Sequence, residues 1–437
     1  MILSLKSMWL LVAAAGLGSA AQAQQQPGAA DATVVAVPPL STPDDKPTSA
    51  GSTLGIAWQA TQLIAQDLRT TSEVMPLPPA QKDFYSYPEV TAPSFPKWRS
   101  AGAKVLVTGF VQARSDGRIT FGCYVYDVPK GREVARKGFV VDPADWQRAA
   151  HKCSGLAYTA VTGAPGIFDS RIAYVAESGK GSAKVERLAI MDSDGTNHKY
   201  LTAGDTMVLT PRLSPKAARI VFVGYVRGRP QVQLLDVESG RQRPLVPLDA
   251  ISFAPRFSAD GNRIAFSMMT GRNSDIYVAS ADGGTAQRLT TSPAIDTDPS
   301  FSPDGTKIVF ESDRSGSQQL YVMNADGSDE RRISFGTGRY AAPEWSPDGA
   351  WIAFTRRDAG GRRIGVMKPD GTGERLLTNG LTDESATWAP SSRELIFQRS
   401  DPAGNPGLYR ISLDGSEARS VAIPQGGSDP DWSGVMD

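Results

Sequence analysis

Histidine and cysteine are scarce in this chain of 437 residues, which contains two of each: His151, His198, Cys123 and Cys153. Zinc sites with several such ligands and scaffolds held by many disulfides are therefore disfavoured, and we expect neither a metal nor a cofactor. A charge excess is also missing, because 46 lysine and arginine residues balance 46 aspartate and glutamate residues. The composition thus gives no electrostatic reason to expect nucleic acid or an anionic membrane surface as a partner.

Long apolar runs are lacking as well. After the N-terminal region, no stretch approaches the roughly 18 uninterrupted apolar residues of a membrane-spanning helix, so direct membrane insertion is not expected. Turn formers, by contrast, are plentiful, with 43 glycines and 31 prolines, which favours β structure. Apolar residues make up 40% and charged residues 21%, an ordinary globular balance, and the length suggests two to three domains.

The first 23 residues have the pattern of a secretory signal peptide. Lys6 is the only charged side chain before Asp31, and Met8 to Leu17 is an apolar run. Ala21-Gln22-Ala23 then fits a small-residue cleavage site, so we expect cleavage after Ala23 and export. Residues 24–32 have no apolar period and predict a flexible N-terminal segment.

Residues 33–162 predict a small α/β domain, followed by a linker at 163–168. Residues 55–70 carry apolar side chains on one face of a helix, and a second helix is expected to begin at Asp142-Pro143. Apolar and β-branched runs predict strands at 33–37, 104–111, 118–128 and 133–141.

Both cysteines fall in this domain, on faces that can meet. Cys123 shares a strand face with apolar neighbours, and Cys153 lies on the apolar face of the second helix. Two alternatives stay open: a disulfide, which would stabilise the fold by about 3–4 kcal/mol, or two buried free thiols. His151 lies off the apolar stripe of its helix and His198 in an expected turn, so both are predicted to be surface or interface residues.

From residue 169 onward a motif of the form apolar-Ser-Pro-Asp-Gly repeats. It is complete at Phe301 to Gly305 and at Trp345 to Gly349, and degenerate elsewhere. The leading apolar residues are 44 positions apart, or 43 in one case. They are Leu213, Phe257, Phe301, Trp345, Trp388 and Trp432.

A period of about 44 with four short strands per unit is typical of a β-propeller blade. Residues 169–437 therefore predict six blades. The first unit lacks its leading motif, and the partial copy around Trp432 supplies it, so the C-terminal strand should close the ring. The predicted fold class is an α/β N-terminal domain followed by an all-β six-bladed β-propeller. The three tryptophans hold a repeating core position and are expected to pack between blades.

Catalytic motifs are not evident in the repeats. Asp260, Asp304 and Asp348 each precede a glycine in an expected turn, which makes them turn formers first. No G-x-S-x-G sequence occurs, which disfavours a propeller-capped serine peptidase. We therefore do not expect an enzyme.

The chain resembles the TolB family of the Tol–Pal system along nearly all of its mature length. The resemblance rests on Asp145-Trp146, Ala150-His151 and Phe168 to Val175, and on the run Tyr321 to Gly327. It also rests on Leu209 to Arg212 and Phe253 to Ser258. It implies a periplasmic interaction scaffold that serves outer-membrane integrity and envelope constriction during cell division.

In that family, one mouth of the propeller holds the lipoprotein Pal, and the loops before each innermost strand line this mouth. The resemblance implies a Pal-binding rim made of Thr210, Pro211, Ala254, Pro255, Thr297, Asp298, Pro299, Ala342, Ser385 and Asp429. It also implies that TolA binds the N-terminal segment, with Gln24, Gln25 and Asp31, although this segment lacks the family's β-branched pattern. Other outer-membrane lipoproteins or porins are further implied partners.

Two other functions remain open at this point. One is a hydrolase or lyase with its substrate in the central channel, which would need catalytic carboxylates or histidines on the inner strands. The other is a periplasmic propeller that binds a small ligand or a carbohydrate, for which Trp345, Trp388 and Trp432 would be the candidate contacts.

Overall fold

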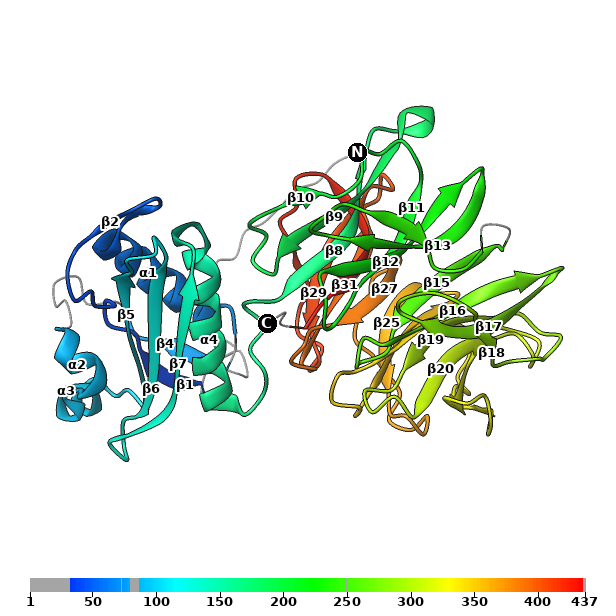
Figure 1. Cartoon of the computed structure of the whole chain (residues 1–437). Coiled ribbons are helices and arrows are strands. Elements are labelled where there is room, and N and C mark those ends of the chain that lie inside the picture. The colour runs from blue at the N-terminus through cyan, green and yellow to red at the C-terminus, as the bar shows by residue number, and fades with distance from the viewer. Residues whose placement is uncertain (1–31, 72, 79–85, 248–249, 435–437) are drawn as a thin grey trace, which may run out of the picture.

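The structure is a computed structural model that describes residues 32–71, 73–78, 86–247 and 250–434. The expected signal peptide and the TolA-binding candidates Gln24, Gln25 and Asp31 lie outside these residues. Figure 1 shows an α/β domain on the left and a propeller on the right, joined by the segment that follows α4(Trp146–Thr162). None of the described helices is both long enough and apolar enough to cross a membrane.

A five-stranded mixed sheet forms the centre of the α/β domain, in the order β4-β1-β5-β6-β7. β1 pairs in parallel with β4 and β5, whereas β5, β6 and β7 form an antiparallel meander. The strands are β1(Thr33–Ala36), β4(Val74–Pro76), β5(Val105–Ala113), β6(Ile119–Asp127) and β7(Arg132–Val141). A short hairpin, β2(Pro47–Thr48) and β3(Gly51–Ser52), precedes the first helix.

Helices cover both faces of this sheet. α1(Thr53–Arg69) and α4 pack on the face that presents Val35 and Val107, while α2(Tyr87–Thr91) and α3(Phe95–Ser100) lie on the face of Leu106. The predicted helix at 55–70 is α1, which begins where the Ser52 hydroxyl accepts the N–H of Gly55 at 3.1 Å. The helix predicted from Asp142 begins with a 3-10 turn, η1(Pro143–Asp145), and continues as α4.

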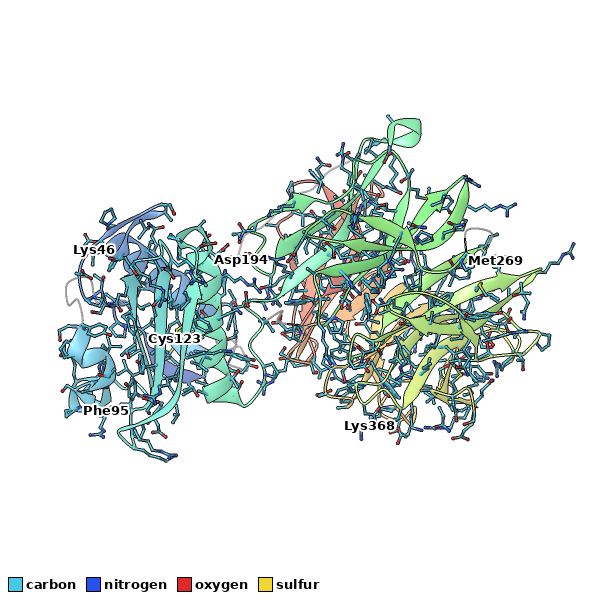
Figure 2. All side chains as sticks on the ribbon, viewed as in Figure 1. Lys46, Phe95, Cys123, Asp194, Met269 and Lys368 are labelled. Carbon is cyan, nitrogen blue, oxygen red and sulfur yellow. A yellow bond between two sulfur atoms is a disulfide. The ribbon has the colours of Figure 1, made fainter. Side chains whose placement is uncertain are left out.

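The two cysteines form a disulfide that ties α4 to the sheet. Cys123 on β6 and Cys153 on α4 have Cα atoms 5.7 Å apart, and neither side chain is exposed. Figure 2 shows Cys123 inside the α/β domain, between strand and helix. The sequence leaves open a disulfide or two free thiols, and the structure contains the disulfide.

Replacing both cysteines by alanine should lower the free energy of unfolding of the α/β domain by about 3 kcal/mol. The bond spans a sequence separation of 30 residues, and cross-linking a loop of that length removes chain entropy from the unfolded state. Urea denaturation of the double variant and of the oxidised wild type gives the difference. If the two midpoints coincide, the disulfide does not contribute to stability.

The propeller consists of six four-stranded antiparallel sheets, all within the described residues. The first three blades, from inner to outer strand, are β31(Gly426–Trp432), β8(Arg171–Ser178), β9(Val185–Asp192), β10(Lys199–Tyr200); β11(Val208–Leu213), β12(Arg219–Val226), β13(Arg229–Asp236), β14(Gln242–Pro244); and β15(Ser252–Phe257), β16(Arg263–Thr270), β17(Asn273–Ser280), β18(Gln287–Arg288). A single 3-10 turn, η2(Gly181–Ala183), joins β8 to β9.

The remaining three blades repeat the same plan. They are β19(Asp296–Phe301), β20(Lys307–Ser312), β21(Gln319–Asn324), β22(Arg331–Arg332); β23(Arg339–Trp345), β24(Ile352–Asp358), β25(Gly361–Met367), β26(Arg375–Leu376); and β27(Asp383–Trp388), β28(Glu394–Ser400), β29(Pro406–Ser412), β30(Arg419–Ser420). Six blades, as the repeat predicts, surround one central channel.

The C-terminal strand closes the ring. β31 pairs antiparallel with β8, so that Trp432 lies opposite Ile172, and the last partial repeat completes the first blade. The repeated tryptophans pack between blades: the indole N–H of Trp388 donates to the carbonyl of Glu344 at 3.1 Å, on the preceding blade. Trp345, Trp388 and Trp432 are each no more than 7% exposed. These rings thus join neighbouring blades.

The α/β domain contacts the end of the propeller at which the innermost strands end. Arg393, in a turn at that end, forms an ion pair with Glu73 of the α/β domain at 2.6 Å. Arg148 of α4 forms a second pair with Asp169, just before β8, at 3.1 Å. The opposite end of the propeller therefore faces away from the α/β domain.

Candidate functional site

Each innermost strand contains a β-bulge at the same position. Six non-glycine residues there have φ between 44° and 55°, in the left-handed region, and the pairing with the second strand shifts around each of them. They are Thr210, Ala254, Asp298, Ala342, Ser385 and Asp429. All six belong to the predicted Pal-binding rim.

The bulges line the central channel and contact each other across neighbouring blades. Asp429 accepts the backbone N–H of Thr210 at 3.1 Å and the hydroxyl of Ser385 at 3.2 Å. The backbone N–H of Asp298 donates a hydrogen bond to the hydroxyl of Ser267, on the adjacent blade, at 3.2 Å. The structure therefore brings the predicted residues into one ring.

Their position differs from the sequence expectation in one respect. The sequence pattern predicts these residues in loops that precede the innermost strands, but they lie within the strands themselves. A proline follows five of the six bulge residues, and proline cannot donate to a ladder of hydrogen bonds, so the pattern resembles a loop. The bulge accommodates the proline, and the pairing resumes two residues later, as between Arg212 and Val221.

Acidic side chains dominate the channel near the bulges. Glu311, on β20, is 5% exposed, and burial together with the nearby Asp298 raises the pKa of its carboxyl to about 8. Burial also raises the pKa values of Asp298 and Asp429, while the positive charge of Arg256 opposes this shift for both. These carboxyls retain protons at a higher pH than free ones do.

Arg256 separates this acidic part of the channel from the other end. Its guanidinium Nη2 lies 3.0 Å from Glu344 Oε2, an ion pair between the third and fifth blades. The carboxylate of Glu344 also accepts the Thr387 hydroxyl, at 2.6 Å, and the backbone N–H of Trp388, at 3.2 Å. Two contacts from the sixth blade therefore hold Glu344, the acidic member of the pair, in place.

Sequence reasoning missed this pair, although a signal for it exists. The residue before each leading apolar residue of the repeat lies at the same depth in the channel. One period apart, these residues are Arg212, Arg256, Ser300, Glu344, Thr387 and Asp431. This polar position changes its charge from blade to blade, whereas the turn and core positions beside it repeat with similar residues, and that contrast is the signal in the sequence.

Exposed apolar side chains gather at the end of the propeller at which the innermost strands begin, which we call the distal mouth. Met207, Ile295 and Leu381 precede β11, β19 and β27 there and are 46%, 48% and 71% exposed. Phe335, before β23, is 73% exposed, and Met269, at the end of β16, is 40% exposed. Figure 2 places Met269 on the side turned away from the α/β domain. Exposed apolar side chains at one end of a propeller make that end a candidate protein-binding surface.

The two histidines lie in different environments, His151 between the domains and His198 on the first blade. His151 is 2% exposed, between the two domains, with Nδ1 at 2.9 Å from Asp67 and Nε2 at 3.5 Å from Asp194 of the propeller. Burial is the largest single influence on the pKa of His151 and lowers it, but the hydrogen bond to Asp67 and the negative charges of Asp67, Asp194 and Asp192 together outweigh burial, so the pKa is raised. Ser154 donates to the same Asp67 oxygen, at 2.6 Å, and not to the imidazole, which is unlike a catalytic triad. The sequence predicts that both histidines are surface or interface residues, and His151 lies in the interface between the domains. His198 is half-buried and forms a hydrogen bond with a tyrosine hydroxyl.

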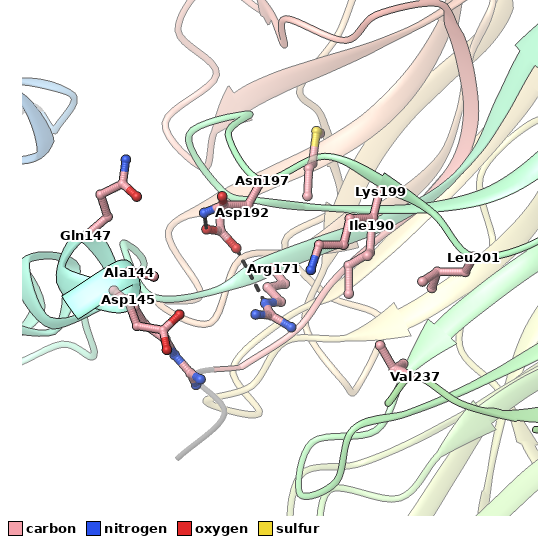
Figure 3. Close-up of a pocket in the computed structure, with 12 residues that line it drawn as sticks. Ala144, Asp145, Gln147, Arg171, Ile190, Asp192, Asn197, Lys199, Leu201 and Val237 are labelled. Atoms are coloured by element: carbon pink, nitrogen blue, oxygen red, sulfur yellow. Dashed lines mark hydrogen bonds and ion pairs between the residues drawn. The ribbon is translucent and has the colours of Figure 1, made fainter. Parts of the chain in front are cut away.

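A small hollow of about 200 Å³ lies where α4 meets the first blade. Figure 3 shows Asp145 and Gln147 on the α4 side, opposite Arg171, Asp192 and Lys199 of the blade. Arg171 and Asp192 form an ion pair at 3.4 Å across the blade's edge. The charges of this hollow therefore compensate one another in part, and it belongs to the domain interface. Among the described residues, in this hollow and outside it, no group of three or more His, Cys, Asp or Glu side chains could hold a metal ion.

The fold defines a class of protein: a six-bladed propeller that follows an N-terminal α/β domain. Residues 158–436 match the family model described as the TolB beta propeller domain, and residues 26–134 match the TolB amino-terminal domain. The chain belongs to the TolB family.

Individual relatives agree with this family. A Tol-Pal system protein TolB from Zymomonas mobilis is 47% identical over 212 residues, which are 48% of this chain and 46% of that protein. Another from Rhizorhabdus wittichii is 47% identical over 202 residues, 46% of either chain. The chain thus spans about half the length of the curated relatives it matches. The crystal structure of TolB from Acinetobacter baumannii is similar over 92% of this chain and 96% of that one, with a TM-score of 0.73 and 25% identity.

Proposed function

We propose that the chain is a non-enzymatic scaffold of the Tol–Pal system that binds the lipoprotein Pal through its distal mouth. The observation that carries this proposal is the gathering of exposed apolar side chains around the acidic channel. Family membership makes the partners of that system the first candidates. In this role the protein serves outer-membrane integrity and envelope constriction during cell division.

The geometry of the distal mouth suits a convex protein partner. Apolar side chains such as Ile295 and Leu381 supply area that a partner can bury, and the channel inside them holds acidic groups that can accept hydrogen bonds. Thr297, Asp298 and Ala254 lie on the innermost strands that carry the bulges. Affinity should be concentrated in a few of these residues, as in other interfaces.

The proposal includes export to the periplasm after cleavage behind Ala23, and TolA binding by the segment that begins at Gln24. Sequence pattern supports export, and family membership supports TolA as a partner. Other outer-membrane lipoproteins or porins are further proposed partners.

Calorimetric titration of the mature chain, from Gln24, with the soluble domain of Pal from the same organism tests the main proposal. We expect a dissociation constant near or below about 1 μM, which corresponds to about −8 kcal/mol. The absence of both heat and complex at about 100 μM would reject Pal as the partner. A parallel titration with the periplasmic domain of TolA tests the N-terminal segment, with a chain that starts at Thr33 as the matched control.

A further inference from the structure

The other end of the channel opens into a bowl of about 430 Å³, on the side of the α/β domain. We call it the proximal bowl. Its wall comes from the turns that follow the innermost strands, and Pro165 of the interdomain segment borders it. Its outer wall is formed by Pro215, Ala259, Pro303, Pro347, Pro390 and Gly434, and its middle wall by the six leading apolar residues of the repeat. This size is within the usual range for sites of small ligands.

The floor of the proximal bowl is polar, and it is the ring that sequence reasoning missed. Arg212 and Arg256 lie on two neighbouring blades, and Glu344 and Asp431 lie on others. The apolar wall and the charged floor together resemble sites that hold an amphipathic molecule with its polar end inward.

Three buried hydrogen-bond donors that line the bowl lack an acceptor. They are Nε of Arg212, Nη1 of Arg256 and Nε1 of Trp345. Arg212 and Trp345 are each 7% exposed, so water does not replace the missing partner freely. Glu344 Oε2, an acceptor on the same floor, also makes no hydrogen bond, although it lies 3.0 Å from Arg256 Nη2. Buried donors are almost always paired in folded proteins, and three unpaired donors against one unpaired acceptor on one cavity indicate that an acceptor group from outside belongs there.

We propose that the proximal bowl binds a carboxylate group attached to an apolar body. The carboxylate accepts hydrogen bonds from Arg212 and Arg256 on the floor, and the apolar body contacts the proline and aromatic wall. Arginine binds planar carboxylates well because its donors match their geometry. The group is carried either by a small molecule or by the C-terminus of an apolar peptide, and the same contacts serve both.

The acidic residues of the floor define how this binding depends on pH. Burial and the charge of Glu344 raise the pKa of Asp431 to about 7, while Arg256 opposes the shift. Asp431 also faces Arg212, at 3.8 Å, and accepts the backbone N–H of Leu213, at 2.7 Å. Below pH 7 Asp431 is mostly neutral and repels a carboxylate less, so binding should tighten as the pH falls from 8 to 6.

The test uses the mature chain, two carboxylates and their neutral amides, with tryptophan fluorescence as the readout. The probes are 3-phenylpropionate against 3-phenylpropionamide, and N-acetyl-Leu-Phe with a free C-terminus against its C-terminal amide. We expect saturable binding of the acids that is about tenfold or more tighter than that of the amides. The first pair reports a small-molecule ligand and the second a peptide terminus, and whichever acid binds more tightly identifies the source.

Two variants locate the site. Arg212→Gln should weaken binding of the acid about tenfold and leave the amide unchanged. Ala259→Trp, at an exposed position of the outer wall, should block the bowl without touching the floor. Ala101→Trp, at an exposed position of the α/β domain, is the matched control and should bind like the wild type.

The proposal is overturned if neither acid saturates the signal, if acid and amide bind equally, or if Ala259→Trp binds as Ala101→Trp does. Heat-denaturation midpoints of the variants show whether each of them is folded, so that lost binding is not mistaken for lost structure. Pal is absent from all of these measurements. Their outcome is therefore independent of the function proposed for the distal mouth.

Discussion

Ile295→Asp should weaken Pal binding by about 100-fold or more, without a measurable loss of stability. Ile295 lies at the distal mouth directly before β19, and its side chain is 48% exposed, so the substitution buries no charge in the free protein. In a complex the same carboxylate would be placed in an apolar contact and lose its water. Interface residues of this kind typically account for about 2–4 kcal/mol. Calorimetric titration with the soluble Pal domain measures the change.

Val134→Asp is the control for this variant. Val134 is 43% exposed on β7 of the α/β domain. Its substitution likewise replaces an exposed β-branched apolar side chain by aspartate, but on a surface far from the distal mouth. Its affinity for Pal should equal that of the wild type. If Ile295→Asp and Val134→Asp bind Pal equally well, Pal does not contact this part of the propeller, and the assignment of the distal mouth is wrong.

Glu311→Gln should stabilise the propeller by about 4 kcal/mol above pH 8 and have almost no effect at pH 5. The pKa of Glu311 is raised to about 8 in the folded chain, from 4.5, because the carboxyl is buried close to Asp298. The folded state therefore binds this proton more strongly than the unfolded state does, and each pKa unit corresponds to about 1.4 kcal/mol. Wild-type stability should thus fall as the pH rises from about 4.5 to 8, and a neutral amide removes that loss.

Urea denaturation of wild type and Glu311→Gln at pH 5 and at pH 8.5 gives the four free energies that the prediction needs. Glu417→Gln, at an exposed position between β29 and β30, is the matched control and should change stability by less than about 0.5 kcal/mol at either pH. A Glu311→Gln variant that is less stable than the wild type at both pH values would contradict the prediction. It would mean that the ionised carboxylate has a stabilising partner.

Under the proposed function, the buried acidic groups of the channel belong to a binding site and lower the stability of the free protein. Asp298, Glu311 and Asp429 would each be easier to bury as neutral residues, and their raised pKa values measure that cost. A partner that supplies hydrogen-bond donors to them would recover part of it. Residues that oppose folding are typically retained at sites of function.

Much of the fold could be predicted from local sequence patterns. The 44-residue period determines the blades because each unit contains the same turns and alternating strands, such as the Pro303-Asp304-Gly305 turn before β20. The missing start of the first unit and the extra copy at Trp432 likewise predict closure of the ring, which the pairing of β31 with β8 provides. Helix α1 and the meander of β5, β6 and β7 follow from apolar periodicity alone.

The position of the rim residues needed the tertiary structure. Proline after Thr210 or Ala254 indicates a break in pairing, but a loop and a bulge have the same local pattern. Only the pairing partner on the second strand distinguishes them, and that partner lies at a distance along the chain. The disulfide is a similar case. The sequence predicts which strand face carries Cys123 and which helix face carries Cys153, but the distance of 5.7 Å between their Cα atoms depends on how α4 packs on the sheet.

The sequence by itself determined the domain types and the number of blades, because these depend on short-range periodicity and turn chemistry. The tertiary structure decided which residues from different blades meet. The pair of Arg256 and Glu344, the acidic group around Glu311 and the floor of the proximal bowl each join side chains that are dozens of residues apart. Charge interactions act through space at distances of a few ångströms, so they appear only when the ring is closed.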